Sequence, residues 1–157
     1  LGGGASSRLF QQVREQRGLC YSIYSYGAGH AETGVFCIYT ALNKETEAKA
    51  LATIHRVIDD FLAKGPTTEE LERAREQSKA NVIMGLESTQ SRMSHAGRSL
   101  LFSGEILTPE QILDAYDRVT REDVVALAQE IFAWDRASLS AVGQVRTAEE
   151  YRQLVLG

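Results

Sequence analysis

The sequence predicts an α+β domain, in which several helices pack on a small antiparallel or mixed sheet. There are two strand-like apolar segments, one that begins near residue 19 and one that spans Thr33–Leu42. A glycine-bearing turn joins them. A long run of helical patterns then precedes a third strand-like segment, Ala137–Val142. Strands and helices that are grouped, rather than strictly alternating, are typical of an α+β layered domain.

The first expected element is a short helix that follows a glycine loop. Ser6 or Ser7 can cap it, and Gly18 ends it; its apolar stripe consists of Leu9, Phe10 and Val13. A strand follows, in which alternate residues face opposite sides: Leu19, Tyr21 and Ile23 on one, and Cys20, Ser22 and Tyr24 on the other. Arg14 and Tyr21 therefore lie at the two ends of a helix-to-strand corner, where we expect the chemistry.

The second strand, Thr33–Leu42, should pair with the first as an antiparallel hairpin. Asn43 is the expected cap of a long helix that ends at Gly65 and Pro66 and covers one face of the sheet. Thr67 and Glu70 have the spacing of a capping box and start a second long helix, whose predicted inner side is Leu71, Ala74, Ser78, Val82 and Leu86.

Three further helices are expected before the last strand-like segment and a fourth after it. They are Ser88–Phe102, one that starts at Thr108 and Pro109, one capped by Thr120, and a short one around residues 149–154.

Composition limits the classes of protein that the chain can represent. Its 157 residues, 43% of them hydrophobic, are expected to form a single domain, 1–157. A net charge of −4 without a basic cluster argues against nucleic-acid binding, and no apolar run approaches the ~20 residues of a membrane span. Cys20 and Cys37 are expected to be reduced, buried thiols.

Several long segments resemble the carboxy-terminal, zinc-less half of the M16 zinc metallopeptidases, the pitrilysin and mitochondrial processing peptidase type that includes bacterial processing proteases. They are LGGGASSRLFQQVREQRGLCYS, TGVFCIYTAL, TTEELERAREQSKANVIMGLESTQSRM and LTPEQILDAYDRVTREDV, in that order over residues 1–143. The resemblance implies a layered α+β domain with a larger sheet, whose first strand and helix precede the glycine loop. Because the glycine loop stands at the start of this sequence, the resemblance predicts that the chain is truncated at its amino terminus and has an exposed sheet edge.

The resemblance also implies roles for two residues. The family's R-x6-Y pair falls on Arg14 and Tyr21. Tyr21 would be catalytic and substrate-binding, because a phenol can donate to the scissile carbonyl and to the oxyanion formed from it. Arg14 would bind substrate by holding a peptide carbonyl. The alternatives are that Arg14 is a surface cation near Glu15, and that Tyr21 packs in the core with its hydroxyl at the rim.

The family's zinc motif, His-x-x-Glu-His, is absent from this sequence. His30, His55 and His95 are isolated, and His55 with Asp59 is the nearest approach to a ligand pair, although such a pair is more often a contact on a helix face. We expect this chain to bind no cofactor and zinc to be bound by a partner or amino-terminal half.

Two functions are consistent with these observations. The chain is either the substrate-binding half of a zinc metalloendopeptidase, predicted inactive as an isolated domain, or a structural or protein-interaction module of the same fold. In the first case its partners are a zinc-bearing M16 domain or subunit and a peptide or protein substrate. The two halves would lie in one polypeptide or in a homo- or heterodimer.

Overall fold

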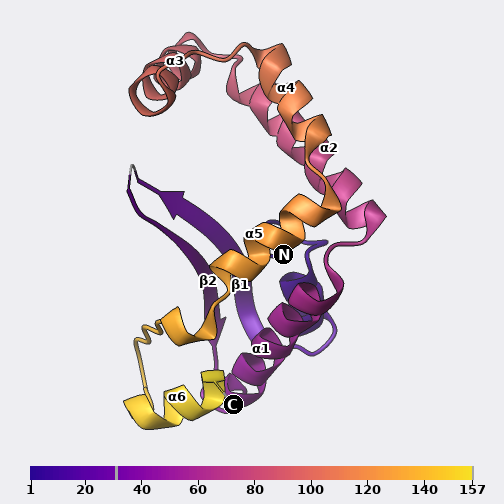
Figure 1. Ribbon diagram of the computed structural model, residues 1–157. Helices are drawn as coiled ribbons and strands as arrows, with labels where there is room; N and C mark the ends of the chain where they lie inside the picture. The colour runs from indigo at the N-terminus through magenta and orange to yellow at the C-terminus, as the bar shows by residue number, and fades with distance from the viewer. Residues whose placement is uncertain (31, 157) are drawn as a thin grey trace. The chain divides into compact units, whose positions relative to one another are not determined.

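The computed structural model describes residues 1–30 and 32–156, which form two compact units (Figure 1). The first comprises Leu1–Lys64 with Ala128–Gly157, and the second comprises Gly65–Leu127. Their secondary structure confirms the α+β class. That residues 1–157 behave as a single domain stays a prediction.

The first unit is built on an antiparallel hairpin, as expected. Strand β1 (Cys20–Gly29) pairs with β2 (Gly34–Leu42) in a register that places Tyr24 opposite Tyr39. Residue 31, which falls between the two strands in sequence, lies outside the described residues. One face of the hairpin carries Ile23 and Phe36, and the ring of Phe36 meets Phe132 edge-on at 5.1 Å between centroids.

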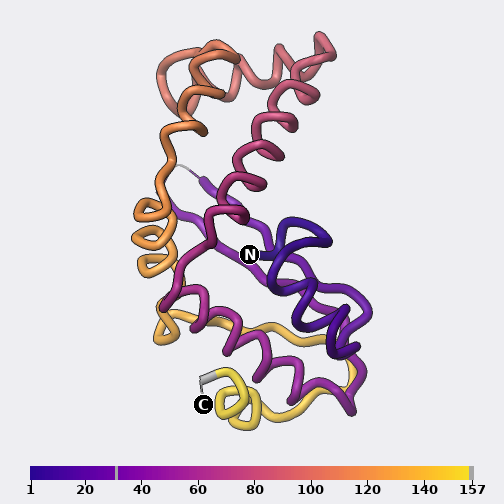
Figure 2. The backbone as a smooth tube through the Cα atoms, turned by 90° about the vertical axis from the view of Figure 1, so that its right-hand side faces the viewer, coloured from indigo at the N-terminus to yellow at the C-terminus, as the bar shows by residue number. Residues whose placement is uncertain are grey.

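Helix α1 (Glu47–Lys64) supplies much of the core of this unit, and Figure 2 shows it beside the amino-terminal helical turn η1 (Phe10–Glu15). The apolar faces of these elements and of β1 meet, which keeps them out of water. The resulting cluster of buried residues is Leu9, Val13, Leu19, Ile23, Ala50, Ile54, Val57 and Ile58. The predicted helix over one face of the sheet is thus confirmed.

The start of α1 differs from the expectation. Asn43 does not cap it; its carbonyl instead accepts hydrogen bonds from the backbone N–H and hydroxyl of Thr46, in a turn before Glu47. The same Thr46 hydroxyl also donates to the carbonyl of Leu19 at 2.8 Å. The helix is therefore fixed to the beginning of β1 by Thr46.

Helix α6 (Ala148–Leu156) packs against α1, after the short helix η2 (Trp134–Arg136). The prediction of a strand at Ala137–Val142 was wrong, because no strand pairs with this segment among the described residues. In the described part of the chain the sheet consequently has two strands rather than three.

The second unit contains α2 (Thr68–Gly85), α3 (Thr89–Ser103), α4 (Pro109–Arg118) and most of α5 (Arg121–Ile131), which ends in the first unit. Capping boxes at Thr67 and Thr108 start α2 and α4, which lie side by side. The expected inner side of α2 is half-buried, apart from Ala74, which is exposed. An ion pair also joins the two helices, in which Nζ of Lys79 on α2 lies 2.9 Å from a carboxylate oxygen of Asp117 on α4.

Gly65 ends α1 in the left-handed conformation, with a φ of 68°. A Cβ at this position would lie 2.7 Å from Cγ2 of Val125 and 3.0 Å from Nη2 of Arg121. We therefore expect Gly65→Ala to lower the free energy of unfolding by about 1–3 kcal/mol in urea titration, from backbone strain and crowding together. Gly97→Ala is the control, because Gly97 lies inside α3 with no atom near its Cβ position. Gly97→Ala should raise the free energy of unfolding by about 0.5–1 kcal/mol. Equal changes in the two variants would contradict the prediction.

Candidate functional site

The corner between η1 and β1 is closed by backbone hydrogen bonds that require a glycine. Gln16 N–H donates to Gln11 five residues back, as in a π-helix, and Gly18 N–H donates to Arg14, both at 2.9 Å. Gly18 has a φ of 59°, which lets the chain turn directly into β1. Arg14 therefore lies in the last turn of the helix, next to the start of the strand.

Tyr21 is the extra residue of a β-bulge. Cys20 pairs with Leu42 but Ser22 pairs with Ala41, so β1 uses two steps where β2 uses one. The predicted alternation fails here: Leu19 and Ile23 are both 4% exposed, whereas Tyr21 is 84% exposed. Its expected position on their side of the strand was therefore wrong, because the bulge interrupts the period of two.

The structure brings Arg14 and Tyr21 together through the backbone of the tyrosine. Nε of Arg14 donates to the carbonyl oxygen of Tyr21 at 2.8 Å. The guanidinium lies over the ring of Phe10, 4.7 Å from its centroid, and Nη1 is 3.3 Å from a carboxylate oxygen of Glu15. Neither Nη2 of Arg14 nor the hydroxyl of Tyr21 hydrogen-bonds to any residue in the described part of the chain.

This geometry decides between some of the alternatives left by the sequence. Tyr21 is not a core aromatic, because most of its side chain is in solvent. Arg14 does pair with Glu15, but both side chains are substantially exposed, and ion pairs of that kind contribute only about 0–1 kcal/mol to stability. The hydrogen bond to the bulge is the more specific contact of Arg14.

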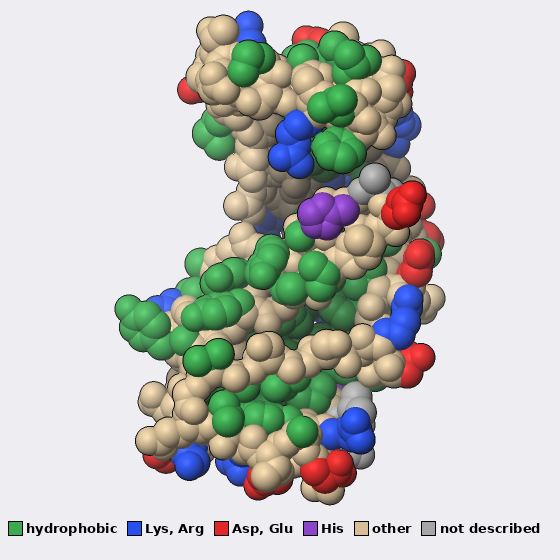
Figure 3. All heavy atoms as spheres, turned by 90° about the vertical axis from the view of Figure 1, so that its left-hand side faces the viewer, with side chains coloured by type: hydrophobic (Ala, Val, Ile, Leu, Met, Phe, Trp, Pro, Cys, Tyr) green, Lys and Arg blue, Asp and Glu red, His purple; other side chains and the backbone are tan. Residues whose placement is uncertain are grey.

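The hairpin also presents an aromatic face that was not predicted from the sequence. Tyr24 and Tyr39 are paired across the strands and stack with 5.0 Å between ring centroids, and Tyr26 follows at 6.1 Å from Tyr24. All three are about half exposed. The alternation of Tyr24 and Tyr26 was the available signal. Figure 3 shows hydrophobic side chains gathered over much of the side of this unit that it displays.

The glycine loop packs closely at one residue and is open at the others. A Cβ at Gly2 would lie 2.6 Å from Oγ of Ser25, and the carbonyl of Gly2 accepts from Ser25 N–H at 3.0 Å. Gly3 and Gly4 have no atom near their Cβ positions and line an open hollow of about 370 Å³ together with Phe10 and Tyr24.

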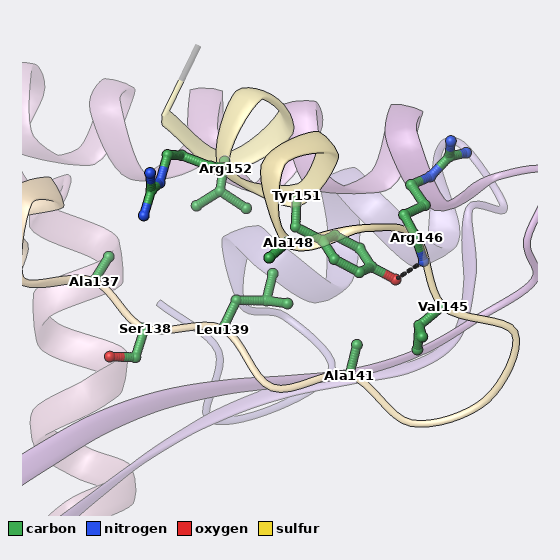
Figure 4. Close-up of a pocket in the computed structure, with 10 residues that line it drawn as sticks. Ala137, Ser138, Leu139, Ala141, Val145, Arg146, Ala148, Tyr151 and Arg152 are labelled. Carbon is green, nitrogen blue, oxygen red and sulfur yellow. Dashed lines mark hydrogen bonds between the residues drawn. The ribbon is translucent and has the colours of Figure 1, made fainter.

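A second hollow, of about 340 Å³, lies between α6 and the segment before it (Figure 4). Its lining is largely apolar. The guanidinium of Arg146 forms an ion pair with Glu47, in which Nε lies 2.6 Å from a carboxylate oxygen. The hydroxyl of Tyr151 donates to the other oxygen of Glu47 at 2.5 Å. These groups connect α6 to the first turn of α1, which indicates a structural role.

The described residues do not fit a zinc ion. Residues 1–30 and 32–156 contain no group of three or more His, Cys, Asp or Glu side chains that could hold a metal. Nδ1 of His55 is 3.0 Å from Asp59, but the other oxygen of Asp59 accepts from the indole of Trp134, and the His55 ring stacks on that indole at 4.2 Å. The His55 and Asp59 pair therefore attaches η2 to α1.

Two further observations concern cysteines and membranes. Cys20 and Cys37 are free and partly buried, and burial raises the pKa of the Cys20 thiol, which favours its protonated form. Among the described helices, none combines the length and apolar character needed to cross a membrane.

Comparison with known proteins places this chain in a family. The model described as "Peptidase M16 inactive domain" matches residues 1–78. An uncharacterized zinc protease of Streptomyces coelicolor is 38% identical over 152 residues, which cover 97% of this chain and 33% of that protein. The uncharacterized zinc protease YmxG of Bacillus subtilis is also 38% identical, over 87% of this chain and 34% of that protein.

A solved structure agrees with these matches. The peptidase M16 inactive domain from Pseudomonas fluorescens superposes with a TM-score of 0.74 at 27% identity, over 85% of this chain and 31% of that one. The chain thus spans about a third of the length of these relatives.

The fold and these matches together define a domain of the zinc-protease type. The chain belongs to the M16 peptidase family, in which it is an inactive domain of the carboxy-terminal type.

Proposed function

We propose that this chain is the substrate-binding half of an M16-type zinc metalloendopeptidase and acts with a separate or amino-terminally connected His-x-x-Glu-His half. The observation that carries the proposal is the exposed phenol of Tyr21, which is held on a bulge beside Arg14. Zinc would be bound by the other half and would supply Lewis-acid chemistry at the scissile carbonyl.

In this proposal Tyr21 is the catalytic residue of the chain. Its O–H donates to the carbonyl oxygen of the scissile peptide bond and, more strongly, to the oxyanion that develops there. A donor aimed at developing charge contributes about 3 kcal/mol of transition-state stabilisation. The exposure of Tyr21 supports this role, because a buried phenol could not reach a substrate.

Arg14 is proposed to bind the substrate with Nη2, which is not used by the described residues. The guanidinium can donate from Nε to the protein and from Nη2 to a peptide carbonyl at the same time, because its donors point in fixed, different directions. Tyr24, Tyr26 and Tyr39 supply exposed aromatic surface that would contact side chains of an extended peptide.

The test is hydrolysis of an internally quenched peptide by the complete two-half protein, with bound zinc measured in each preparation. Tyr21→Phe should reduce turnover while zinc content and fold are retained. Unchanged turnover would reject the proposal and favour a structural or interaction role for this half.

A further inference from the structure

We infer that Arg14 is a positioning residue for Tyr21, in addition to any contact it makes with substrate: its Nε–H fixes the bulge and thereby the direction of the phenol. The inference rests on the proposed catalytic role of Tyr21. It is drawn from the hydrogen bond between Nε of Arg14 and the carbonyl oxygen of Tyr21, at 2.8 Å.

Tyr21 needs support from its backbone because its side chain receives little. With 84% of the residue exposed and no hydrogen bond from its hydroxyl to a described residue, the ring is not fixed by packing. The bulge also places Tyr21 where the ladder shifts register, between the pairs made by Cys20 and Ser22. The bond from Arg14 holds the peptide group at this irregular point.

Arg14 is itself well fixed. Its carbonyl accepts from Gly18 N–H at 2.9 Å, and its guanidinium lies over the ring of Phe10 and beside Glu15. The two bonds, from Gly18 to Arg14 and from Arg14 to Tyr21, close residues 14–21 into one corner. Thr46 connects this corner to the start of α1 through the carbonyl of Leu19.

Positioning of this kind affects catalysis because the phenol has to meet a particular oxygen. A donor that is displaced by about 1 Å can lose as much as 10²-fold in rate. Lysine could not replace this arginine. The guanidinium has separate donors, so that Nε can bind the carbonyl of Tyr21 while Nη2 stays available for substrate, whereas lysine has a single ammonium nitrogen.

A double-mutant cycle in the complete two-half enzyme tests the inference. The variants are Arg14→Ala, Tyr21→Phe and the two combined, with kcat and KM measured for each. If Arg14 acts through Tyr21, Arg14→Ala lowers kcat by about 10- to 100-fold when Tyr21 is present. In the Tyr21→Phe background it lowers kcat by less than about 2-fold, because the group that it positions is gone. Its effect on KM, which reports the substrate contact, should be the same in both backgrounds.

Arg17→Ala is the matched control, because Arg17 lies at the same corner but donates to the carbonyl of Gln12 and not to the bulge. It should leave kcat unchanged in both backgrounds, and Arg14→Lys should behave like Arg14→Ala while keeping the charge.

Two results would overturn the inference, and they are distinguishable. An equal effect of Arg14→Ala on kcat in both backgrounds, including no effect in either, would show that Arg14 does not act through Tyr21, and the proposed function would stand. No loss from Tyr21→Phe alone would reject the proposed function, and the positioning role with it.

Discussion

Tyr21→Phe is expected to lower kcat for peptide hydrolysis by about 10²- to 10³-fold in the complete enzyme, the loss typical of removing one oxyanion donor. The substitution removes only the hydroxyl, which makes no hydrogen bond to a described residue, so the bulge and the contact with Arg14 should persist. KM and bound zinc should change little. Steady-state kinetics with metal analysis measures all three quantities.

Tyr24→Phe is the matched control for this variant. Tyr24 lies on the same strand and is 46% exposed, but it is in the regular ladder and stacks on Tyr39. Tyr24→Phe keeps the aromatic ring that would contact a peptide and removes only a hydroxyl that is not aimed at the reacting carbonyl, so kcat should stay within about 2-fold of the native value. Similar losses in both variants would mean that the tyrosines act through general surface properties.

Much of the fold could be predicted because its signals are local. The capping box at Thr67, the helix start at Thr108, the stop at Gly65 and the hairpin depend on residues close in sequence, and the structure has each of them. The segment 137–142 could not be predicted in the same way. Its apolar pattern fits a strand, but a strand also needs a neighbour to share its hydrogen bonds, and none is present among the described residues.

The helix-to-strand corner that carries the candidate site could be predicted, but its detailed geometry could not. The spacing of Arg14, Gly18 and Tyr21 indicated a corner, and the structure forms it. The bulge was missed, because alternation assumes a regular ladder and the register shift is set by β2, about 20 residues away. For the same reason the aromatic pair of Tyr24 and Tyr39 appears only once the register is known.

The second large effect expected is on stability, at Glu47. Its carboxylate, with 12% of the side chain exposed, accepts from Nε of Arg146 at 2.6 Å and from the hydroxyl of Tyr151. Glu47→Ala leaves both donors without this acceptor, which should lower the free energy of unfolding by about 3 kcal/mol. Urea titration measures the change. Glu149→Ala is the control, because the Glu149 carboxylate is 67% exposed and its contact with Arg152 is long, at 3.8 Å. This substitution should change the free energy of unfolding by less than about 0.5 kcal/mol.

The same cluster makes a separate prediction about alkaline pH. The hydrogen bond to Glu47 raises the pKa of Tyr151, with burial as a further cause, so the folded state favours the neutral phenol. A raised pKa means that this stabilisation is complete below the ordinary tyrosine pKa of about 10 and is lost as the pH rises through the folded-state value. Native protein should therefore lose more stability than Tyr151→Phe as the pH rises above about 10, measured by urea titration at each pH. Parallel stability curves for the two proteins would show that Tyr151 does not share its proton with Glu47 in the folded state.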